Sequence, residues 1–502
     1  MKNHSTTSDS LDLAAIAHQA MIDAGFVADL PQAVSDELRG IESTGQSSDA
    51  DREARDMRAL LWSSIDNRES RDLDQVECAE ALPNGDVRVS VGIADVDALV
   101  HIASAIDAHA AKNGTSVYTG IKTFSMLPEE LSTDMTSLVG GADRSSIVID
   151  MVVASDGTVK ASDVYRATIH NYAKLSYDAV GAWLDQKGEV PAAVASVPGM
   201  DAQIRLQLET AMRLGELRKQ HGALELETIQ ATPVLNDAGQ VTDLAVTKNN
   251  GARDLIENFM IAANVAMAQF LEAKGVMSLR RIVRTPEQWP RIVEVAHALG
   301  ERLPEAPDSR ALADFLARRK VADPVHFPDL SLSIVKLLGP GEYAVQKPTS
   351  AGEGHFGLAV HDYTHSTAPN RRYADLVTQR LVKAALRNAP APYTEEPLST
   401  IARHCTERED AARKVERKMR KVAAAVLLEH RIGEEFDSIV TGVTPKGTFA
   451  RLTRPPVDGR VMRGEYGLRV GDKVRVRLAR TDPLRGFIDF ARSDDRHSAK
   501  EV

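Results

Sequence analysis

An acidic segment near the start of the chain has the residue types of a metal site. Asp66, Asp72 and Asp74 lie in the polar run from Ser64 to Gln75, which has turn character and borders a β-rich region. Carboxylates at this density repel one another unless water solvates them or a cation neutralises them. Hard oxygen donors suit Mg²⁺, whose remaining positions take water and substrate phosphate. Spacing alone leaves two interpretations open, a solvated acidic loop and a magnesium site.

A second polar segment, from Tyr363 to Leu376, contains two adjacent arginines and runs into a helix. Arg371 and Arg372 lie where that helix is expected to begin. Guanidinium groups beside the free N–H groups of a helix start can bind a phosphate. The alternative is that the arginines pair with acids of the helix such as Asp375.

The same segment contains a spacing that resembles a zinc hydrolase motif. His361 and His365 are four residues apart, with Asp362 beside the first. However, the acid is aspartate rather than glutamate, and Pro369 follows within about one helical turn. The context therefore argues against zinc hydrolysis.

The elements that must position these residues change in type along the chain. Residues 11–41 predict two amphipathic helices, and residues 45–55 a linker. Short β-like runs follow from 66 to about 153, and helical periodicity dominates about 172–220, 254–275, 285–340 and 372–432. Five short strand-like runs after Gly433 predict a small barrel. The fold class expected is α+β with a C-terminal five-stranded barrel.

Composition excludes several classes of protein. The 502 residues are 43% hydrophobic and 26% charged, which is typical of a globular chain rather than a disordered or fibrous one. Cys78 and Cys405 match no metal-ligand spacing and form no disulfide framework. The polar start does not resemble a signal peptide, and no apolar run is long enough for a membrane span. A cytoplasmic protein without membrane insertion is expected.

Charge is distributed unevenly. Lys and Arg number 61 and Asp and Glu 71, so the net charge is 61 − 71 = −10. Residues 1–56 carry 4 basic and 11 acidic residues, a local −7, whereas residues 437–492 carry 12 and 6, a local +6. A basic patch on an acidic protein indicates a focused site for a polyanion.

Five motifs together resemble the catalytic RNB domain of the ribonuclease II family, which hydrolyses single-stranded RNA from its 3′ end. They occur in the family's order: SIDNRESRDLDQ at 64–75, VGIADVDALV at 91–100, FSMLPEELS at 124–132, LIENFMIAANVA at 255–266 and HFGLAVHDYTHSTAPNRRYADL at 355–376. Residues 434–494 similarly resemble the family's S1 RNA-binding domain, a five-stranded OB-fold. The resemblance implies an exoribonuclease that releases nucleoside 5′-monophosphates.

The resemblance implies a metal centre with one substitution. Asp66, Asp72 and Asp74 match three of four family aspartates that hold Mg²⁺, with Mn²⁺ as a substitute, and Asp74 matches the one essential for chemistry. Gln75 occupies the position of the fourth, where an amide can donate an oxygen but carries no charge. The implied mechanism uses two metal ions. A chain that binds RNA without cutting it is the alternative.

The resemblance also implies roles in RNA contact. Arg371 matches an arginine on the attacked phosphate, Glu416 a catalytic acid, and Tyr118 an aromatic that stacks on nucleotides and sets the length of the final product. Tyr177 and Glu257 match residues that line the path and sense the ribose 2′-OH. For these two, a packed tyrosine and a capping acid are the alternatives. Arg372, Lys446 and Phe449 are further expected RNA contacts.

The expected organisation has four parts. Residues 1–50 form a short acidic helical segment, 51–432 the RNB catalytic domain, 434–494 the S1-like barrel and 495–502 a polar tail. The N-terminal segment is too short for the cold-shock domains that precede the family's catalytic domain. The expected partner is single-stranded RNA rather than DNA, and the expected state is a monomer in the cytoplasm.

Overall fold

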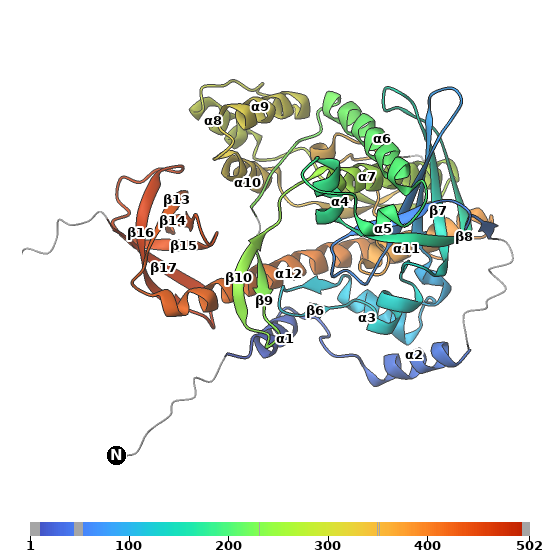
Figure 1. Ribbon diagram of the computed structural model, residues 1–502, viewed down its shortest axis with the longest axis horizontal. Coiled ribbons are helices and arrows are strands. Elements are labelled where there is room, and N and C mark those ends of the chain that lie inside the picture. Colours follow the sequence, from blue (N-terminus) through green and yellow to red (C-terminus); the bar gives the residue numbers. More distant parts are fainter. Residues whose placement is uncertain (1–10, 45–53, 230, 349, 351, 494–502) are drawn as a thin grey trace, which may run out of the picture.

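The computed structural model describes residues 11–44, 54–229, 231–348, 350 and 352–493. Figure 1 shows a body of mixed helices and strands, from which the long helix α12 (Glu395–Leu428) runs to a small barrel. Most of the expected linker and all of the expected polar tail lie outside the described residues.

The body is built on a six-stranded sheet in the order β1-β8-β2-β3-β4-β7. β7 also pairs with β8, so the sheet curls back on itself. In β4, aliphatic residues alternate with Arg88, Ser90 and Gly92, and all of its residues except Arg88 are buried, so both faces of the strand are covered. The strands are β1 Arg55–Asp56, β2 Trp62–Asp66, β3 Gln75–Ala81, β4 Val87–Ala94, β7 Asp143–Val153 and β8 Val159–Ser176.

Three pairs of short strands and eleven further helices complete the described body. The paired strands are β5 Val117–Tyr118 with β6 Thr123–Phe124, β9 Ala231–Leu235 with β10 Val241–Val246, and β11 Ser278–Ile282 with β12 Glu342–Gln346. The helices are α1 Leu13–Asp23, α2 Gln32–Thr44, α3 Ala105–Asn113, α4 Tyr177–Leu184, α5 Ala192–Ala195, α6 Met200–Gln220, α7 Gly251–Ala273, α8 Trp289–Ala298, α9 Ser309–Ala322, α10 Phe327–Leu338 and α11 Tyr373–Leu386.

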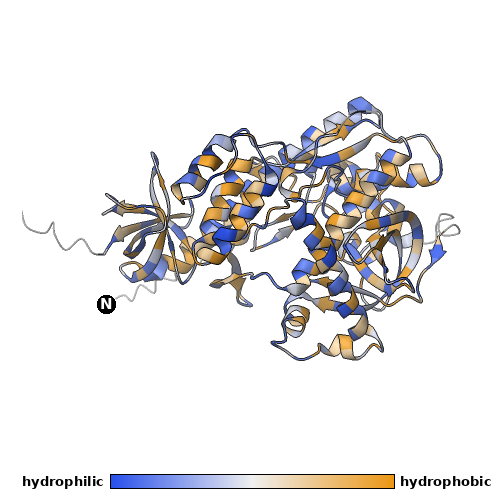
Figure 2. Ribbon diagram, turned by 90° about the horizontal axis from the view of Figure 1, so that it is seen from above, coloured by the Kyte–Doolittle hydropathy of each residue, from blue (hydrophilic) through white to orange (hydrophobic). Residues whose placement is uncertain are grey.

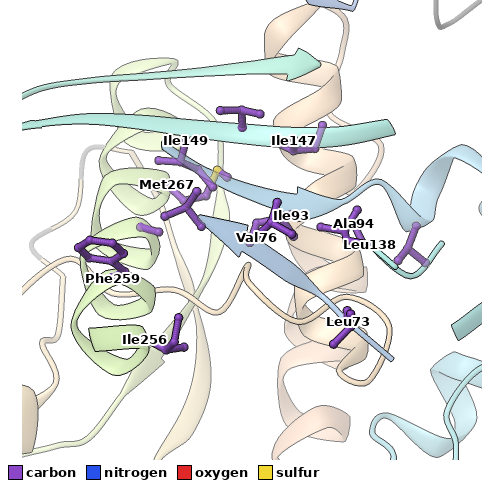
Figure 3. Close-up of a cluster of buried hydrophobic side chains, with 14 of the residues drawn as sticks. Leu73, Val76, Ile93, Ala94, Leu138, Ile147, Ile149, Ile256, Phe259 and Met267 are labelled. Carbon is purple, nitrogen blue, oxygen red and sulfur yellow. The ribbon is translucent and has the colours of Figure 1, made fainter. Parts of the chain in front are cut away.

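Helix α7 packs against strands β4, β7 and β8 of the sheet. Figure 3 shows Met267 of α7 close to Ile149 of β7 and Val76 of β3, and all three are buried. Burying such side chains contributes about 1.5–3 kcal/mol each. This packing joins α7 to the sheet that carries the aspartates.

Helix α6 closes the free edge of β3. β3 pairs with β2 at Ser63 and Glu77 alone, so the backbone of Ala79 lacks a strand partner on that side. The Gln203 side chain replaces the strand: its Oε1 accepts from Ala79 N at 2.5 Å and its Nε2 donates to Ala79 O at 2.8 Å. The backbone N–H and C=O of Ala79 are therefore hydrogen-bonded at this edge without another strand.

Helix α12 connects three hydrophobic cores. Its N-terminal part places Leu398 and Cys405 in the core of the body, its middle places Val415 and Met419 against α1, and its end places Leu428 in the core of the barrel. At about 1.5 Å per residue, 34 residues span about 50 Å. One rigid element thus couples the body, the N-terminal helices and the barrel.

The C-terminal barrel is closed, with strand order β13-β14-β15-β17-β16. Gly459 lies where a Cβ would meet the Phe490 ring at 2.4 Å, so the barrel interior has no room for a larger residue there. Arg451 pairs with Asp329 of α10 at 2.7 Å, which joins the barrel to the body. The strands are β13 Glu435–Thr444, β14 Gly447–Leu452, β15 Asp458–Arg463, β16 Lys473–Asp482 and β17 Phe487–Arg492.

The α+β class and the five-stranded barrel are confirmed, whereas some helix boundaries are wrong. The helix expected from about 172 begins at Tyr177, because β8 continues to Ser176. Residues 172–175 alternate between exposed and buried, which is the period of a strand. The strand pairs β9–β10 and β11–β12 were not expected, since these short strands have no strong apolar alternation.

Hydrophobic residues are spread over the helices, the sheet and the barrel (Figure 2). Within the described residues, no helix combines the length and the apolar character that a membrane span requires.

The N-terminal helices pack against the body. Ala17 and Met21 of α1 are buried against α12 and the β5–β6 pair, and Leu38 of α2 joins the core of the body. Arg408 of α12 donates to the carbonyl oxygens of Ala24 at 3.2 Å and Gly25 at 3.1 Å, just after α1. These helices are therefore part of the support beneath β5 and α12.

Met21→Ala should lower the free energy of unfolding by about 2–5 kcal/mol, because it opens a cavity between α1 and α12. Met21 is 1% exposed, whereas the adjacent Ile22 is 48% exposed. Ile22→Ala is the matched control and should change stability by less than about 0.5 kcal/mol. Thermal and urea unfolding measure both, and equal effects would contradict the packing of α1.

Candidate active site

Asp74 lies at the centre of the site. It directly precedes β3, and its side chain is 3% exposed. Oδ1 accepts from Asn370 N at 2.8 Å, and Oδ2 lies 3.5 Å from Arg371 Nε. Burial raises the pKa of Asp74 to about 8, although the Arg371 charge and the Asn370 amide lower it. Two segments far apart in the chain therefore meet at one buried carboxyl.

The turn that carries Arg371 is fixed through its backbone. Ser116 N donates to the carbonyl oxygen of Arg371 at 2.9 Å, and Thr115 Oγ1 donates to the same atom at 3.1 Å. The Arg371 side chain is 43% exposed, so one side contacts Asp74 while the rest faces solvent. A guanidinium held in this way can contact an incoming anion.

Arg372 has a different environment from Arg371. It caps α11, and its Nη2 donates to Asp375 Oδ1 at 2.7 Å, with the Asp375 side chain fully buried. Arg372 therefore pairs with an acid of the helix, which was the alternative interpretation of the two arginines. Arg371 instead contacts Asp74.

Asp66 ends β2 and faces the same region. Its Oδ1 accepts from Asn67 N at 2.6 Å and Ser70 Oγ at 2.9 Å. Burial is the main reason that the pKa of Asp66 is raised; Asp72 adds to the rise and Arg371 opposes it. The loop between Asp66 and Asp74 is anchored where Leu73 N donates to Ser137 Oγ at 2.9 Å.

Asp72, Tyr118 and Glu416 form a connected group. The Tyr118 hydroxyl donates to Asp72 Oδ2 at 2.9 Å, and Tyr118 N donates to Glu416 Oε1 at 3.1 Å. Burial raises the pKa of both the Tyr118 hydroxyl and the Glu416 carboxyl. Since the Tyr118 side chain is 41% exposed, α12 and the acidic loop together orient an accessible aromatic ring.

The donor chemistry of the site suits a divalent cation, but no ligand set is preassembled. The negative charge of Asp72 raises the pKa of both Asp66 and Asp74, and the positive charge of Arg371 lowers it. Within the described residues, no three His, Cys, Asp or Glu side chains converge closely enough to hold a metal ion. Partly buried carboxylates with little compensating charge fit a hard cation by type.

Gln75 and Tyr177 lie on elements that border the aspartates. Gln75 is the first residue of β3 and pairs with Ile93 of β4. Tyr177 begins α4, directly after the strand that pairs with Asp66, and the Arg253 guanidinium lies 4.3 Å from its ring centroid. Burial raises the pKa of Tyr177, with Asp66 and then Glu77 adding to the rise.

Three other expected RNA contacts lie in different surroundings. Glu257 lies on α7, where the atoms packed around its carboxyl shield it in part from water and raise its pKa, while the nearby Arg218 charge lowers it. Lys446 is exposed in the turn between β13 and β14, and Phe449 is half-buried on β14. The lysine and the phenylalanine therefore belong to the barrel rather than to the aspartate cluster.

The histidines of the rejected zinc motif do not form a metal site in the described part of the chain. His365 is bonded through Nδ1 to the Tyr343 hydroxyl at 2.7 Å, and burial lowers its pKa well below the usual value. His361 is exposed.

A polar cleft of about 1050 Å³ adjoins the cluster. It is lined by the acidic loop, by the β5–β6 pair and by the start of α7, including Asp72, Tyr118, Lys122, Lys248 and Arg253. Cationic side chains and an aromatic ring beside an acidic centre form a surface that can take a phosphate-linked polymer.

Sequence reasoning missed one acidic residue near the site. Glu77 of β3 is 0% exposed, and neither carboxyl oxygen has a hydrogen-bond partner. Burial raises its pKa well above the usual value, and Asp66 adds to the rise. A glutamate inside the strand segment Val-Glu-Cys-Ala was the available signal, because charged residues are seldom fully buried.

In the cation-free protein, the free energy of unfolding of Asp74→Asn relative to that of wild type should be higher at pH 8 than at pH 5. The folded carboxyl titrates at about 8 rather than at its ordinary 3.8, so its contribution to stability is complete below about pH 4 and is lost as pH rises to about 8. The amide does not titrate, so the free energy of unfolding of the variant minus that of wild type should increase by at most about 1.4 kcal/mol per pH unit. Thermal unfolding in EDTA measures this, with exposed Asp201→Asn as the control. A stability difference between Asp74→Asn and wild type that does not change with pH would contradict the raised pKa of Asp74.

Two family models match the chain, the RNB domain at residues 54–388 and the RNase II-type exonuclease C-terminal S1 domain at residues 434–493. Ribonuclease R of Thermotoga maritima is 31% identical, with 87% of this chain and 64% of that protein covered. Ribonuclease R of Escherichia coli is 29% identical, with 94% and 61% covered. The chain spans about three fifths of the length of these relatives.

Solved structures share the fold. The apo form of Mycoplasma genitalium RNase R superposes with a TM-score of 0.85 at 23% identity, covering 96% of this chain and 78% of that one. Yeast Ssd1, described as a pseudonuclease, gives 0.68 at 17% identity, covering 92% and 57%. At these identities the likeness concerns the fold alone. The RNB model spans most of the described body, and the chain belongs to the RNB-domain family.

Proposed function

We propose that this chain is a 3′→5′ exoribonuclease that hydrolyses single-stranded RNA to nucleoside 5′-monophosphates in RNA decay and processing. The observation that carries the proposal is the meeting of Asp74 with Arg371 beside the polar cleft. An acidic centre that can hold cations and a guanidinium that can contact a phosphate are the groups that metal-assisted phosphodiester hydrolysis uses.

Asp66, Asp72 and Asp74 are the residues that would hold the cations, with Gln75 as a neutral oxygen donor. Two Mg²⁺ ions, or Mn²⁺ in their place, would lower the pKa of an attacking water and stabilise the leaving 3′ oxygen. The protein's own part is to keep these side chains at the end of the sheet. β2 ends at Asp66, and β3 begins directly after Asp74.

Arg371 would contact the phosphate under attack. Its guanidinium is oriented by Asp74 and remains partly exposed toward solvent. As negative charge builds on the phosphoryl oxygens, a fixed cation beside them stabilises the transition state. The backbone contacts from Ser116 and Thr115 limit how far this arginine can move.

Tyr118 would stack on the nucleotides nearest the cleavage point. Its hydroxyl is bonded to Asp72 and its backbone to Glu416, so the ring is held at a set distance from the acidic cluster. Stacking contributes about 1–3 kcal/mol per base and tolerates any base. Glu416 then acts through Tyr118 as a positioning residue.

Other expected contacts extend the RNA path. Tyr177 and Glu257 are proposed to distinguish RNA from DNA through the ribose 2′-OH, and Arg372 to support the phosphate loop. Lys446 and Phe449 would bind RNA at the basic barrel, where residues 437–492 carry a local +6. The partner is single-stranded RNA, and the proposed state is a cytoplasmic monomer.

The second candidate is an RNA-binding protein that does not cleave. Gln75 favours it, because an amide at this position removes one negative charge from the acidic cluster. The likeness to the pseudonuclease is compatible with it, since fold alone does not determine activity.

Wild-type protein with 5′-labelled poly(A) and Mg²⁺ should give a descending ladder that ends in a short oligomer. Asp74→Asn should reduce the rate by at least about 100-fold while RNA binding persists, because a cation ligand is lost but Arg371 and the barrel remain. Asp201→Asn, exposed on α6, is the control. Retardation of RNA by wild type without any shortening would favour the second candidate.

Tyr118→Ala should lengthen the final product by one or more nucleotides, since the last stacking contact is removed. Tyr172→Ala is the matched control, because Tyr172 is exposed to a similar degree, 40%, but lies on β8. Denaturing gels of the end products measure the change. An unchanged product length in Tyr118→Ala would reject the stacking role.

A further inference from the structure

Two neighbouring residues with buried hydroxyl groups, Thr136 and Ser137, lie between the acidic loop and the turn that carries Arg371. Thr136 is 5% exposed and Ser137 is 0% exposed. They follow the short helical turn η3 (Leu131–Met135) and lie outside the five motifs of the sequence. A buried hydroxyl costs free energy unless it is hydrogen-bonded, so its partners indicate what it does in the fold.

The Ser137 hydroxyl bonds to the backbone on both sides of Asp72. Its Oγ donates to the carbonyl oxygen of Arg71 at 2.6 Å and accepts from Leu73 N at 2.9 Å. The carbonyl oxygen of Leu73 in turn accepts from Leu138 N at 2.9 Å. One side chain and the backbone amide that follows it therefore fix the acidic loop directly before and after this aspartate.

The Thr136 hydroxyl contacts the residue directly before Arg371. Its Oγ1 donates to Leu131 O at 2.8 Å and lies 2.6 Å from the side-chain amide of Asn370. A hydroxyl has one proton, and Asn370 Nδ2 is buried without a partner among the described residues, so an amide whose nitrogen faces Thr136 satisfies both groups. The backbone N of the same asparagine donates to Asp74 Oδ1 at 2.8 Å. Thr136 therefore supports the contact between this turn and Asp74.

The segment that carries these hydroxyl groups is itself attached to the sheet. Arg144 of β7 donates from Nε to Ser137 O at 3.1 Å, and Asn171 of β8 donates from Nδ2 to Leu138 O at 2.7 Å. Both contacts use backbone carbonyl oxygens, which leaves the two hydroxyl groups available to the site. The acidic loop and the turn that carries Arg371 are therefore both tied to the sheet through this short stretch.

We propose that Thr136 and Ser137 are positioning residues, which hold the Asp72 loop and the turn that carries Arg371 at a fixed separation. In this role they act through backbone contacts and touch neither RNA nor a cation. Reacting groups must be held to within about 0.5 Å, and a misplacement of about 1 Å can reduce a rate about 100-fold. The inference rests on the proposed exoribonuclease function, because it concerns the groups that would hold the cations and the phosphate.

The first test separates the Thr136 hydroxyl from the space that the side chain fills. Thr136→Val keeps the shape and removes the hydroxyl, so kcat on poly(A) should fall about 10- to 100-fold, whereas KM should stay within about twofold because the cleft and the barrel still bind the RNA. Thr136→Ser keeps the hydroxyl and loses a methyl group, so its kcat should remain within about threefold of wild type. Equal losses of kcat in the two variants would assign the effect to packing and overturn the proposal.

The second test removes the Ser137 hydroxyl. Ser137→Ala deletes both backbone contacts beside Asp72 and should lower kcat about 10- to 100-fold with little change in KM. Ser132→Ala is the matched control, because Ser132 is 2% exposed on η3 and its Oγ donates to its own segment, to Pro128 O at 3.3 Å and Glu129 O at 3.5 Å. A loss of kcat in Ser132→Ala as large as that in Ser137→Ala would contradict the positioning role.

Amide hydrogen exchange gives a readout that does not depend on activity. In Thr136→Val, the Asn370 amide that donates to Asp74 should exchange at least about tenfold faster than in wild type, because its segment has lost a support. In Ser137→Ala, the same change is expected for the Leu138 amide. Amides of β7 should keep their wild-type rates. Unchanged exchange at both sites, or faster exchange throughout the chain, would overturn the proposal.

The outcome is separable from that of the proposed function. Wild type that does not shorten RNA would reject the exoribonuclease, and amide exchange in the two variants would then decide the positioning inference by itself. Wild type that degrades RNA, together with wild-type kcat in both Thr136→Val and Ser137→Ala, would keep the exoribonuclease and overturn the inference.

Discussion

The contact that the rest of the site depends on is the one between the Asp74 carboxyl and the turn at Asn370 and Arg371. A carboxyl on a side chain that is 3% exposed is unfavourable in isolation, and a backbone N–H and a guanidinium offset part of that cost. The partners come from segments 296 positions apart in the chain. The sheet and α11 must therefore both be correctly placed before this one interaction can form.

Helix α12 extends this constraint over the whole described molecule. Its acid Glu416 holds the backbone of Tyr118, while residues on either side of it pack against α1 and the barrel. Glu416 and the residues in the barrel core belong to the same helix, so a displacement of the barrel that moves α12 would also move Glu416 and the backbone of Tyr118 bonded to it. Arg451 and Asp329 provide a second link between barrel and body, so the barrel is held at two places.

The sequence contained enough information for the fold class, the barrel and the RNB and S1 matches, because long periodic segments and ordered motifs carry strong signals. Short strands such as β11 and β12 were missed, since their pairing depends on tertiary contacts rather than on local pattern. The different surroundings of Arg371 and Arg372 also required the structure. Adjacent residues of one type look alike in sequence, and only packing shows that one pairs with Asp375 while the other reaches Asp74.

Similarity of fold leaves open how charge is arranged within this site. The described chain places Gln75 at the start of β3 and Glu77 further along the same strand face, so a neutral oxygen donor and a buried acid are neighbours. Two chains with nearly the same backbone can therefore carry different side chains and different charges beside Asp66 and Asp74, so the shared fold does not by itself determine activity.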